Sequence, residues 1–171
     1  SGTLTIAEAT AGFGSTVVWL VVAAFFIATA FVKTGLGARI AYHFMRLLGK
    51  SSLGLAYGIV ATDLVLAPAI PSNTARGGGV IYPVLKSLCL SLGSDSAQGT
   101  QGRIAGFLTF TAYQSVVVTS AMFLTAMAAN PLAAELAGQQ GIEITWVRWA
   151  VAASVPGMLS LLVVPFLIYR L

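Results

Sequence analysis

The stretch Pro68–Gly79, which reads PAIPSNTARGGG, interrupts a long apolar region of the sequence. It places two prolines, three adjacent small polar side chains, an arginine and three glycines between two segments that are apolar enough to lie in a bilayer. Irregular backbone at membrane depth is stable only where protein or a water-filled cavity satisfies its peptide groups. The stretch therefore predicts the tip of a re-entrant helical hairpin, which is a place to bind a polar ligand.

The predicted tip has the chemistry of an anion site. Asn73 and Thr74 are good helix N-caps, and the first turn of the second arm offers unpaired N–H groups at the positive end of a helix dipole. Together with Ser72, they add hydroxyl and amide groups that can donate to a carboxylate or offer oxygens to a cation. Broken helices aimed at a substrate near the bilayer midplane recur in secondary transporters. The alternative is a capped turn between two buried helices, without a ligand.

The composition indicates an integral membrane protein. Of the 171 residues, 57% are hydrophobic and only 8% are charged, whereas soluble domains carry about 25% charged residues. The net charge of +4 does not indicate nucleic-acid binding, because the basic residues are scattered and several flank apolar segments. Cys89 is the only cysteine, which excludes an internal disulfide and a cysteine-based metal site.

Apolar periodicity predicts an all-α membrane fold in five parts. A spanning helix at about 16–32 precedes an interfacial amphipathic helix at about 36–50. The re-entrant hairpin takes about 52–92, a discontinuous helix takes about 103–137, and a last spanning helix takes about 146–170. The discontinuous helix is expected to break around 118–121. The alternative there is a continuous helix whose threonines hydrogen-bond to their own carbonyls.

Charged residues inside the apolar segments should be paired, because an isolated charge in lipid is costly. Asp63 in the first hairpin arm and Lys86 in the second are predicted to form a structural ion pair; Arg76 is the alternative partner for Asp63. The alternative interpretation is that this pair is not structural but takes part in the coupling of transport.

The basic residues also predict an orientation. One side of the scheme carries Lys33, Arg39, Arg46, Lys50, Arg103 and Arg170. The opposite side carries Glu135, Glu143 and only Arg148. The positive-inside rule then puts the base of the hairpin in the cytoplasm, or in the equivalent compartment of an organelle.

Three segments carry a family resemblance: APAIPSNTARGGGVIYP (67–83), TAYQ (111–114) and TSAMFLTAMAANP (119–131). They resemble the first Ser-Asn-Thr hairpin and the following unwound helix of the divalent anion/sodium symporter family. The branch that they resemble comprises the citrate:succinate antiporters and the plastid 2-oxoglutarate/malate translocators. The resemblance implies transport of di- and tricarboxylates by alternating access, through anion exchange or sodium-coupled symport, and no enzyme activity.

The resemblance also implies an architecture and a location. Residues 1–50 would end a static scaffold part, and residues 51–171 would belong to a moving transport domain. The chain would be half of an inverted-repeat transporter that works as a homodimer in a bacterial inner membrane or a plastid inner membrane. Its partners would be a small carboxylate, the lipid bilayer and the missing second repeat.

The implied site lies at the hairpin tip and at the helix break. The residues implied to bind substrate are Ser72, Asn73, Thr74, Arg76, Thr119 and Ser120. Symporters offset the charge of the substrate with sodium, which would lie near Ser72 and Asn73. Here Thr119 and Ser120 stand where symporters have a Gly-Gly-rich loop, and Arg76 supplies a permanent cation. We therefore expect exchange without sodium.

Two other classes of function stay open. Nothing in the chain matches the second Ser-Asn-Thr hairpin, so half of the expected binding site is missing and the chain alone is not expected to transport. It could instead be an inactive membrane fragment with a structural or assembly role. An intramembrane enzyme with Ser72 as nucleophile would need a base, and Asp63 and His43 lie too far from Ser72 along the chain in the predicted scheme.

Overall fold

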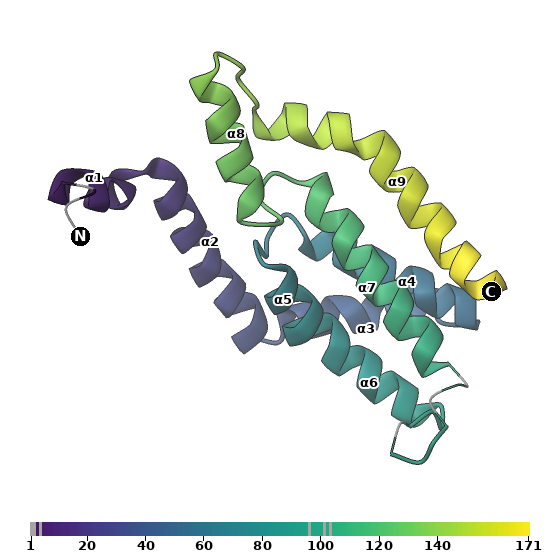
Figure 1. Cartoon of the computed structure of the whole chain (residues 1–171). Coiled ribbons are helices and arrows are strands. Elements are labelled where there is room, and N and C mark those ends of the chain that lie inside the picture. Colours follow the sequence, from purple (N-terminus) through teal and green to yellow (C-terminus); the bar gives the residue numbers. More distant parts are fainter. Residues whose placement is uncertain (1–2, 4, 96, 101, 103) are drawn as a thin grey trace.

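The structure, a computed structural model, describes residues 3, 5–95, 97–100, 102 and 104–171. These residues form helices joined by turns, and no strand occurs among them, which confirms the predicted all-α class. The described part begins with α1 (Ile6–Thr10) and the 3₁₀ turn η1 (Ala11–Gly14), followed by the larger helices shown in Figure 1. Arg103, one of the residues behind the predicted orientation, lies outside the described residues.

Two helices of the described chain are long and apolar enough to cross a bilayer: α2 (Thr16–Lys33) and α9 (Trp146–Arg170). Both coincide with predicted spans. Along α2 only Ala28 is buried, and large apolar side chains project from both helices. A monomer in water rarely exposes so much contiguous apolar surface. Lipid, or another part of a larger assembly, is the environment that suits these two helices.

The predicted amphipathic helix is α3 (Leu36–Leu48). It follows a sharp turn at Gly35, whose φ of 67° lies in the left-handed region that glycine adopts most easily. Gly37 and Ala41 form its buried face, which packs against α4 and the second hairpin arm. The opposite, exposed face carries Arg39, His43 and Arg46.

The segment predicted to form the hairpin folds as two helical arms. The first arm is α4 (Ser52–Leu66), and the turn 67–72 follows it. The second arm comprises α5 (Asn73–Arg76), the π-helical segment η2 (Gly77–Ile81) and α6 (Tyr82–Ser91). A π-helical segment inside an α-helix is rare and often lies at a functional site.

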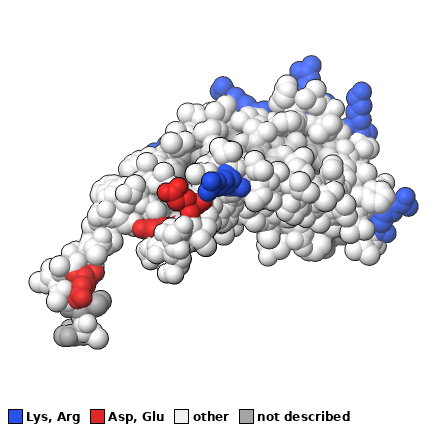
Figure 2. Space-filling model, turned by 90° about the horizontal axis from the view of Figure 1, so that it is seen from above, with Lys and Arg blue, Asp and Glu red and all other residues white. Residues whose placement is uncertain are grey.

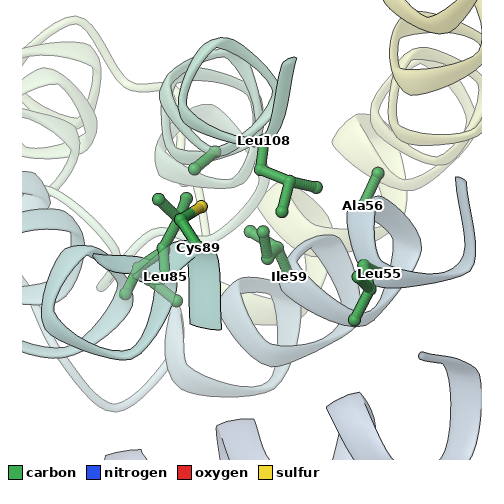
Figure 3. Close-up of a cluster of buried hydrophobic side chains, with 8 residues drawn as sticks. Leu55, Ala56, Ile59, Leu85, Cys89 and Leu108 are labelled. Carbon is green, nitrogen blue, oxygen red and sulfur yellow. The ribbon is translucent and has the colours of Figure 1, made fainter. Parts of the chain in front are cut away.

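An apolar core lies between the two arms and α7 (Ala105–Met122). Figure 3 shows Ile59 of the first arm beside Leu85 and Cys89 of the second arm, with Leu55 farther along the first arm and Leu108 of α7 completing the cluster. Each of these side chains is at most 7% exposed. The core fixes the arms against α7, which places the hairpin tip beside the C-terminal half of that helix.

The discontinuous helix breaks later than predicted. α7 continues through 118–121 and ends at Met122; turns and bends occupy 123–128, and α8 (Ala129–Gln139) follows. The prediction of a break around 118–121 is therefore wrong in position. The helix continues through these residues, and the Ser120 hydroxyl donates to the Val116 carbonyl oxygen of the same helix at 2.5 Å. We call 123–128 the linker.

Asn130 of α8 holds the two helices together across the linker. Its side chain is 5% exposed, and Nδ2 donates to the carbonyl oxygens of Ser120 (2.7 Å) and Phe123 (2.9 Å). Carbonyls at a helix C-terminus have no partner within the helix. Asn130 therefore caps the end of α7 from the start of α8.

Three exposed basic residues lie at the ends of helices. Lys33 ends α2, Lys50 precedes Ser51, the N-cap of α4, and Arg170 ends α9. Most Lys and Arg side chains project from one edge of the molecule, apart from most of the Asp and Glu side chains (Figure 2). This separation matches the charge pattern behind the predicted orientation, while the membrane side itself stays a prediction.

Candidate functional site

The second arm of the hairpin starts as a capped helix. Ser72 is the N-cap, and its hydroxyl accepts a hydrogen bond from the backbone N–H of Ala75 at 3.2 Å. Helical backbone then runs without a break from Asn73 to Ser91. Ser72 and Asn73 are half-buried, and Thr74 is exposed. The N–H groups of the first turn and the helix dipole favour a negatively charged group at this end.

A cavity of about 400 Å³ lies beside this turn, between the second arm and α7. Ligand pockets in proteins have about this size, roughly 300–1,000 Å³. A Cβ atom on Gly78 would meet nothing within 4 Å, so a glycine at this position leaves the cavity open. The polar side chains in its wall are those of Asn73, Thr74, Tyr82, Thr109 and Tyr113.

Asn73 has an unused acceptor. Its Nδ2 faces the sulfur of Met127 at 3.7 Å, which is a weak contact. Its Oδ1 is buried, and no described residue donates a hydrogen bond to it. A buried acceptor without a partner is unfavourable. A ligand that donates a hydrogen bond, or a cation, would remove that cost.

Arg76 is fully buried and joins three segments around the tip. Its Nε forms an ion pair with Oδ1 of Asp63 on α4 at 2.6 Å. Its Nη1 donates to two backbone carbonyl oxygens, of Ile70 in the turn (3.0 Å) and of Ala126 in the linker (3.1 Å). Arg76 therefore fixes the tip against both the first arm and the linker.

The same guanidinium also binds the end of α7. Nη2 donates to the hydroxyls of Ser120 at 2.9 Å and Thr119 at 3.2 Å. The Thr119 hydroxyl in turn donates to Oδ2 of Asp63. All four side chains are at most 2% exposed. We call Asp63, Arg76, Thr119 and Ser120 the buried charge cluster.

The predicted site residues fall into two groups. Asn73 and Thr74 line the cavity, and Ser72 caps the helix that begins there. The side chains of Arg76, Thr119 and Ser120 instead face one another and Asp63. Direct contact between Arg76 and a substrate is not available in this arrangement, because protein oxygens already surround its nitrogen atoms.

The predicted ion pair between Asp63 and Lys86 is corrected. Asp63 pairs with Arg76, the alternative partner that the sequence left open. Lys86 is exposed on α6, whereas its neighbours Leu85 and Cys89 are buried. A charge placed among buried apolar neighbours needs a buried partner, and Arg76 is the cation that enters the core.

Two contacts of the linker were not foreseen from the sequence. The Thr125 hydroxyl donates to the carbonyl oxygen of Pro68 in the tip at 2.8 Å, and it lies 3.2 Å from Nε1 of Trp146. Nε1 of Trp149 donates to the carbonyl oxygen of Ala121 at 2.9 Å. Both tryptophans therefore donate hydrogen bonds to the region where α7 ends.

The described residues contain no group of three or more His, Cys, Asp or Glu side chains that could hold a metal ion. A monovalent cation could instead use neutral oxygens, and the described tip offers the unpaired Oδ1 of Asn73. The arrangement as a whole can bind a small polar ligand beside a rigid, internally neutralised cluster.

Comparisons with known proteins show the family of the chain. A profile described as the sodium:sulfate symporter transmembrane region matches residues 1–171. YflS of Bacillus subtilis (strain 168), provisionally named as a malate transporter, is 54% identical over 172 residues, covering 100% of this chain and 36% of that protein. Dicarboxylate transporter 1, chloroplastic, of Arabidopsis thaliana is 54% identical over 168 residues, covering 98% of this chain and 30% of that protein.

Inner membrane protein YbhI of Escherichia coli (strain K12) is 45% identical over 161 residues, covering 94% of this chain and 34% of that protein. The chain spans about a third of the length of these relatives. The family is one of transporters, not enzymes, and the resemblance drawn from the Ser-Asn-Thr hairpin is confirmed. Because the profile covers every residue, the chain belongs to the sodium:sulfate symporter transmembrane family.

Proposed function

We propose that the full-length carrier transports C4-dicarboxylates or related di- and tricarboxylates, and that one carboxylate rests on Ser72, Asn73 and Thr74. The supporting observation is the capped hairpin tip beside a cavity of about 400 Å³, in a chain of this family. The names of two relatives refer to malate and dicarboxylate transport. The other two thirds of the carrier supply the rest of the site.

Helix lengths support a re-entrant hairpin. The first arm has 15 residues, or roughly 22 Å at 1.5 Å per residue. The hydrocarbon core of a bilayer is about 30 Å thick, so this arm is too short to cross it. With its base at one membrane surface, the turn 67–72 lies inside the bilayer. The buried charge cluster and the linker then satisfy the polar groups of the turn.

Anion exchange is the favoured mode of transport. The guanidinium of Arg76 lies among carbonyl and hydroxyl oxygens of the turn, α7 and the linker. A sodium ion at the same place would use oxygens of that kind. Arg76 holds the tip against the linker permanently, as a positioning residue, so sodium is not needed for that task. Since Asp63 balances its charge, groups outside the described residues neutralise the substrate.

Sodium-coupled symport is the second candidate. The observation in its favour is the buried Oδ1 of Asn73, which has no donor among the described residues. A sodium ion near Asn73 and Ser72 would use this oxygen and would bring positive charge next to the carboxylate.

The remaining expectations complete the proposal. Residues 1–50 belong to a scaffold part, residues 51–171 to a transport domain, and an inverted second repeat faces this hairpin in a homodimeric carrier. An inactive fragment with a structural role is the alternative for the isolated chain. The isolated chain is then stable in detergent without any response to dicarboxylates.

The test is counterflow of labelled succinate by the full-length carrier in liposomes. We expect uptake against internal malate in sodium-free buffer, unchanged when sodium is added. Uptake that needs sodium would replace exchange by symport. Absence of uptake under both conditions, for a carrier that is folded and takes up sulfate, would contradict the dicarboxylate proposal.

A matched pair of variants tests the role of Arg76. Arg76→Gln alone leaves Asp63 buried without a cation, so we expect a poorly folded carrier. The double variant with Asp63→Asn and Arg76→Gln removes both charges and leaves neutral hydrogen-bonding groups. If Arg76 acts only by positioning the tip, the double variant folds and retains part of its exchange. Sodium-dependent uptake gained by the double variant would support Arg76 as a substitute for sodium.

A further inference from the structure

We propose that the outer face of α3 is a binding site for anionic lipids, with Arg39, His43 and Arg46 contacting the phosphate groups. These residues stand at positions i, i+4 and i+7, so they share one face of the helix. All three are exposed. The described residues of α3 include no Asp or Glu that would neutralise them.

The packing of α3 against the hairpin arms keeps its basic face exposed. On the opposite side, Gly37 and Ala41 are buried. A Cβ atom on Gly37 would lie 2.7 Å from a methyl carbon of Val80, so the second hairpin arm leaves no room for a larger residue. A Cβ atom on Gly58 would lie 2.8 Å from the methyl carbon of Met45, so α4 is equally close. The helix cannot rotate without losing both contacts.

The position of α3 suits a membrane surface. Only Thr34 and Gly35 separate it from Lys33, the last residue of the spanning helix α2, and Lys50 lies between it and α4. Both lysines are exposed and extend the basic face at its two ends. Figure 2 shows basic side chains projecting along one edge of the molecule. A cluster of basic residues beside a spanning helix attracts anionic lipid.

Apolar groups beside the basic face favour a lipid over a free anion. Leu36 and Leu47 are exposed on one flank, and Tyr42 on the other. Tyr42 also lines a cavity of about 140 Å³, whose wall includes Val32 of α2 and Val84 of α6. A phosphate on the basic residues would leave an acyl chain close to this mostly apolar cavity. Tyrosine is itself common at the membrane interface.

The test uses the full-length carrier in a neutral detergent and two double variants with the same change in charge. Arg39→Gln with Arg46→Gln alters the basic face of α3. Lys86→Gln with Arg148→Gln removes two exposed cations elsewhere. Binding of phosphatidylglycerol and of phosphatidylcholine is measured by native mass spectrometry and by the shift in Tm that each lipid causes.

We expect phosphatidylglycerol to bind the unmodified carrier more tightly than phosphatidylcholine. Each basic residue near a membrane surface changes the affinity for anionic lipid about fivefold, so the α3 variant should bind roughly 25-fold more weakly. The control variant should bind as the unmodified carrier does. Equal binding by the two variants, or full competition by an equal concentration of inorganic phosphate, would overturn the proposal. Because the altered side chains are exposed, Tm without lipid should not change.

Discussion

At the residue scale, the ion pair of Asp63 and Arg76 determines the geometry of the tip. Both side chains are 0% exposed. A buried pair is not in itself strongly stabilising, because both charges lose their hydration. Here the guanidinium also hydrogen-bonds to the turn, the linker and α7, so the pair specifies where three segments meet. Removing one member would leave the other charge without compensation.

The first prediction concerns Asp63→Asn, which keeps the size of the side chain and removes its charge. We expect a loss of about 3–5 kcal/mol in the free energy of unfolding, the range for breaking a buried ion pair. Thermal unfolding of the detergent-solubilised carrier measures it. Lys86→Gln is the matched control, since Lys86 is exposed and forms no ion pair with Asp63. A larger effect at Lys86 than at Asp63 would contradict the corrected pairing.

The sequence alone revealed that Asp63 needs a partner, because a carboxylate inside an apolar arm demands one. The sequence did not determine whether Arg76 or Lys86 pairs with Asp63, since the register of the two arms depends on the exact length of the turn between them. The structure puts Arg76 in the core and Lys86 on the surface. Arg76 was expected to contact the substrate, whereas in the structure its guanidinium pairs with Asp63, for which Lys86 was the predicted partner.

At the element scale, α7, the linker and α8 form a broken helix whose ends are held by side chains. Asn130 caps α7 from α8, Arg76 binds the linker at Ala126, and Thr125 binds the tip at Pro68. Each contact satisfies backbone groups that a continuous helix would pair internally. The break and the hairpin tip therefore form one hydrogen-bonded unit.

The second prediction concerns Asn130→Asp. A carboxylate has no N–H donor, so the carbonyls of Ser120 and Phe123 lose their partner and meet a negative charge. We expect a loss of about 1–3 kcal/mol in the free energy of unfolding. Gln140→Glu makes the same change in charge at an exposed site just after α8 and serves as control. Equal stability of the two variants would show that Asn130 does not cap α7.

The third prediction separates two glycines. A Cβ atom on Gly54 would lie 2.0 Å from the backbone oxygen of Leu48, so Gly54→Ala must displace backbone and destabilise the carrier. Overpacking of this kind costs about 1–3 kcal/mol. Gly78→Ala meets nothing within 4 Å and gains up to about 1 kcal/mol of helix propensity. Thermal unfolding measures both.

Gly78→Ala has a second, functional readout. Gly78 lines the cavity, so a methyl group there should slow succinate counterflow although the carrier is at least as stable. Unchanged counterflow would show that neither substrate nor the second repeat approaches this glycine closely.

Element positions were predictable because apolar runs, glycines and prolines mark the ends of helices. The spans at 16–32 and 146–170 and the amphipathic helix after Lys33 coincide with α2, α9 and α3. The position of the break was not predictable, because a run of hydroxyl side chains around 118–121 fits both a break and hydroxyls bonded within a helix. Contacts from Arg76 and Asn130, distant in sequence, decide between these two structures.

At the scale of the whole molecule, the proposal makes this chain one side of a binding site that other parts of the carrier complete. It spans about a third of its relatives, and large apolar side chains stay exposed on α2 and α9. The buried charge cluster is internally neutral, so the proposed binding of a dicarboxylate requires groups elsewhere in the carrier to balance its charge. This could not be read from sequence, where Arg76 looked free to bind the anion.

The most direct measurement of the central claim uses a single thiol at the tip. Thr74 is exposed and lines the cavity, whereas Cys89 is buried and reacts poorly. In a full-length carrier whose other cysteines outside this chain are replaced, Thr74→Cys is alkylated with and without malate. Ala97→Cys, in the exposed loop, is the control. We predict that malate slows alkylation at position 74 and leaves position 97 unchanged, whereas equal rates at position 74 with and without saturating malate would contradict a substrate site at the hairpin tip.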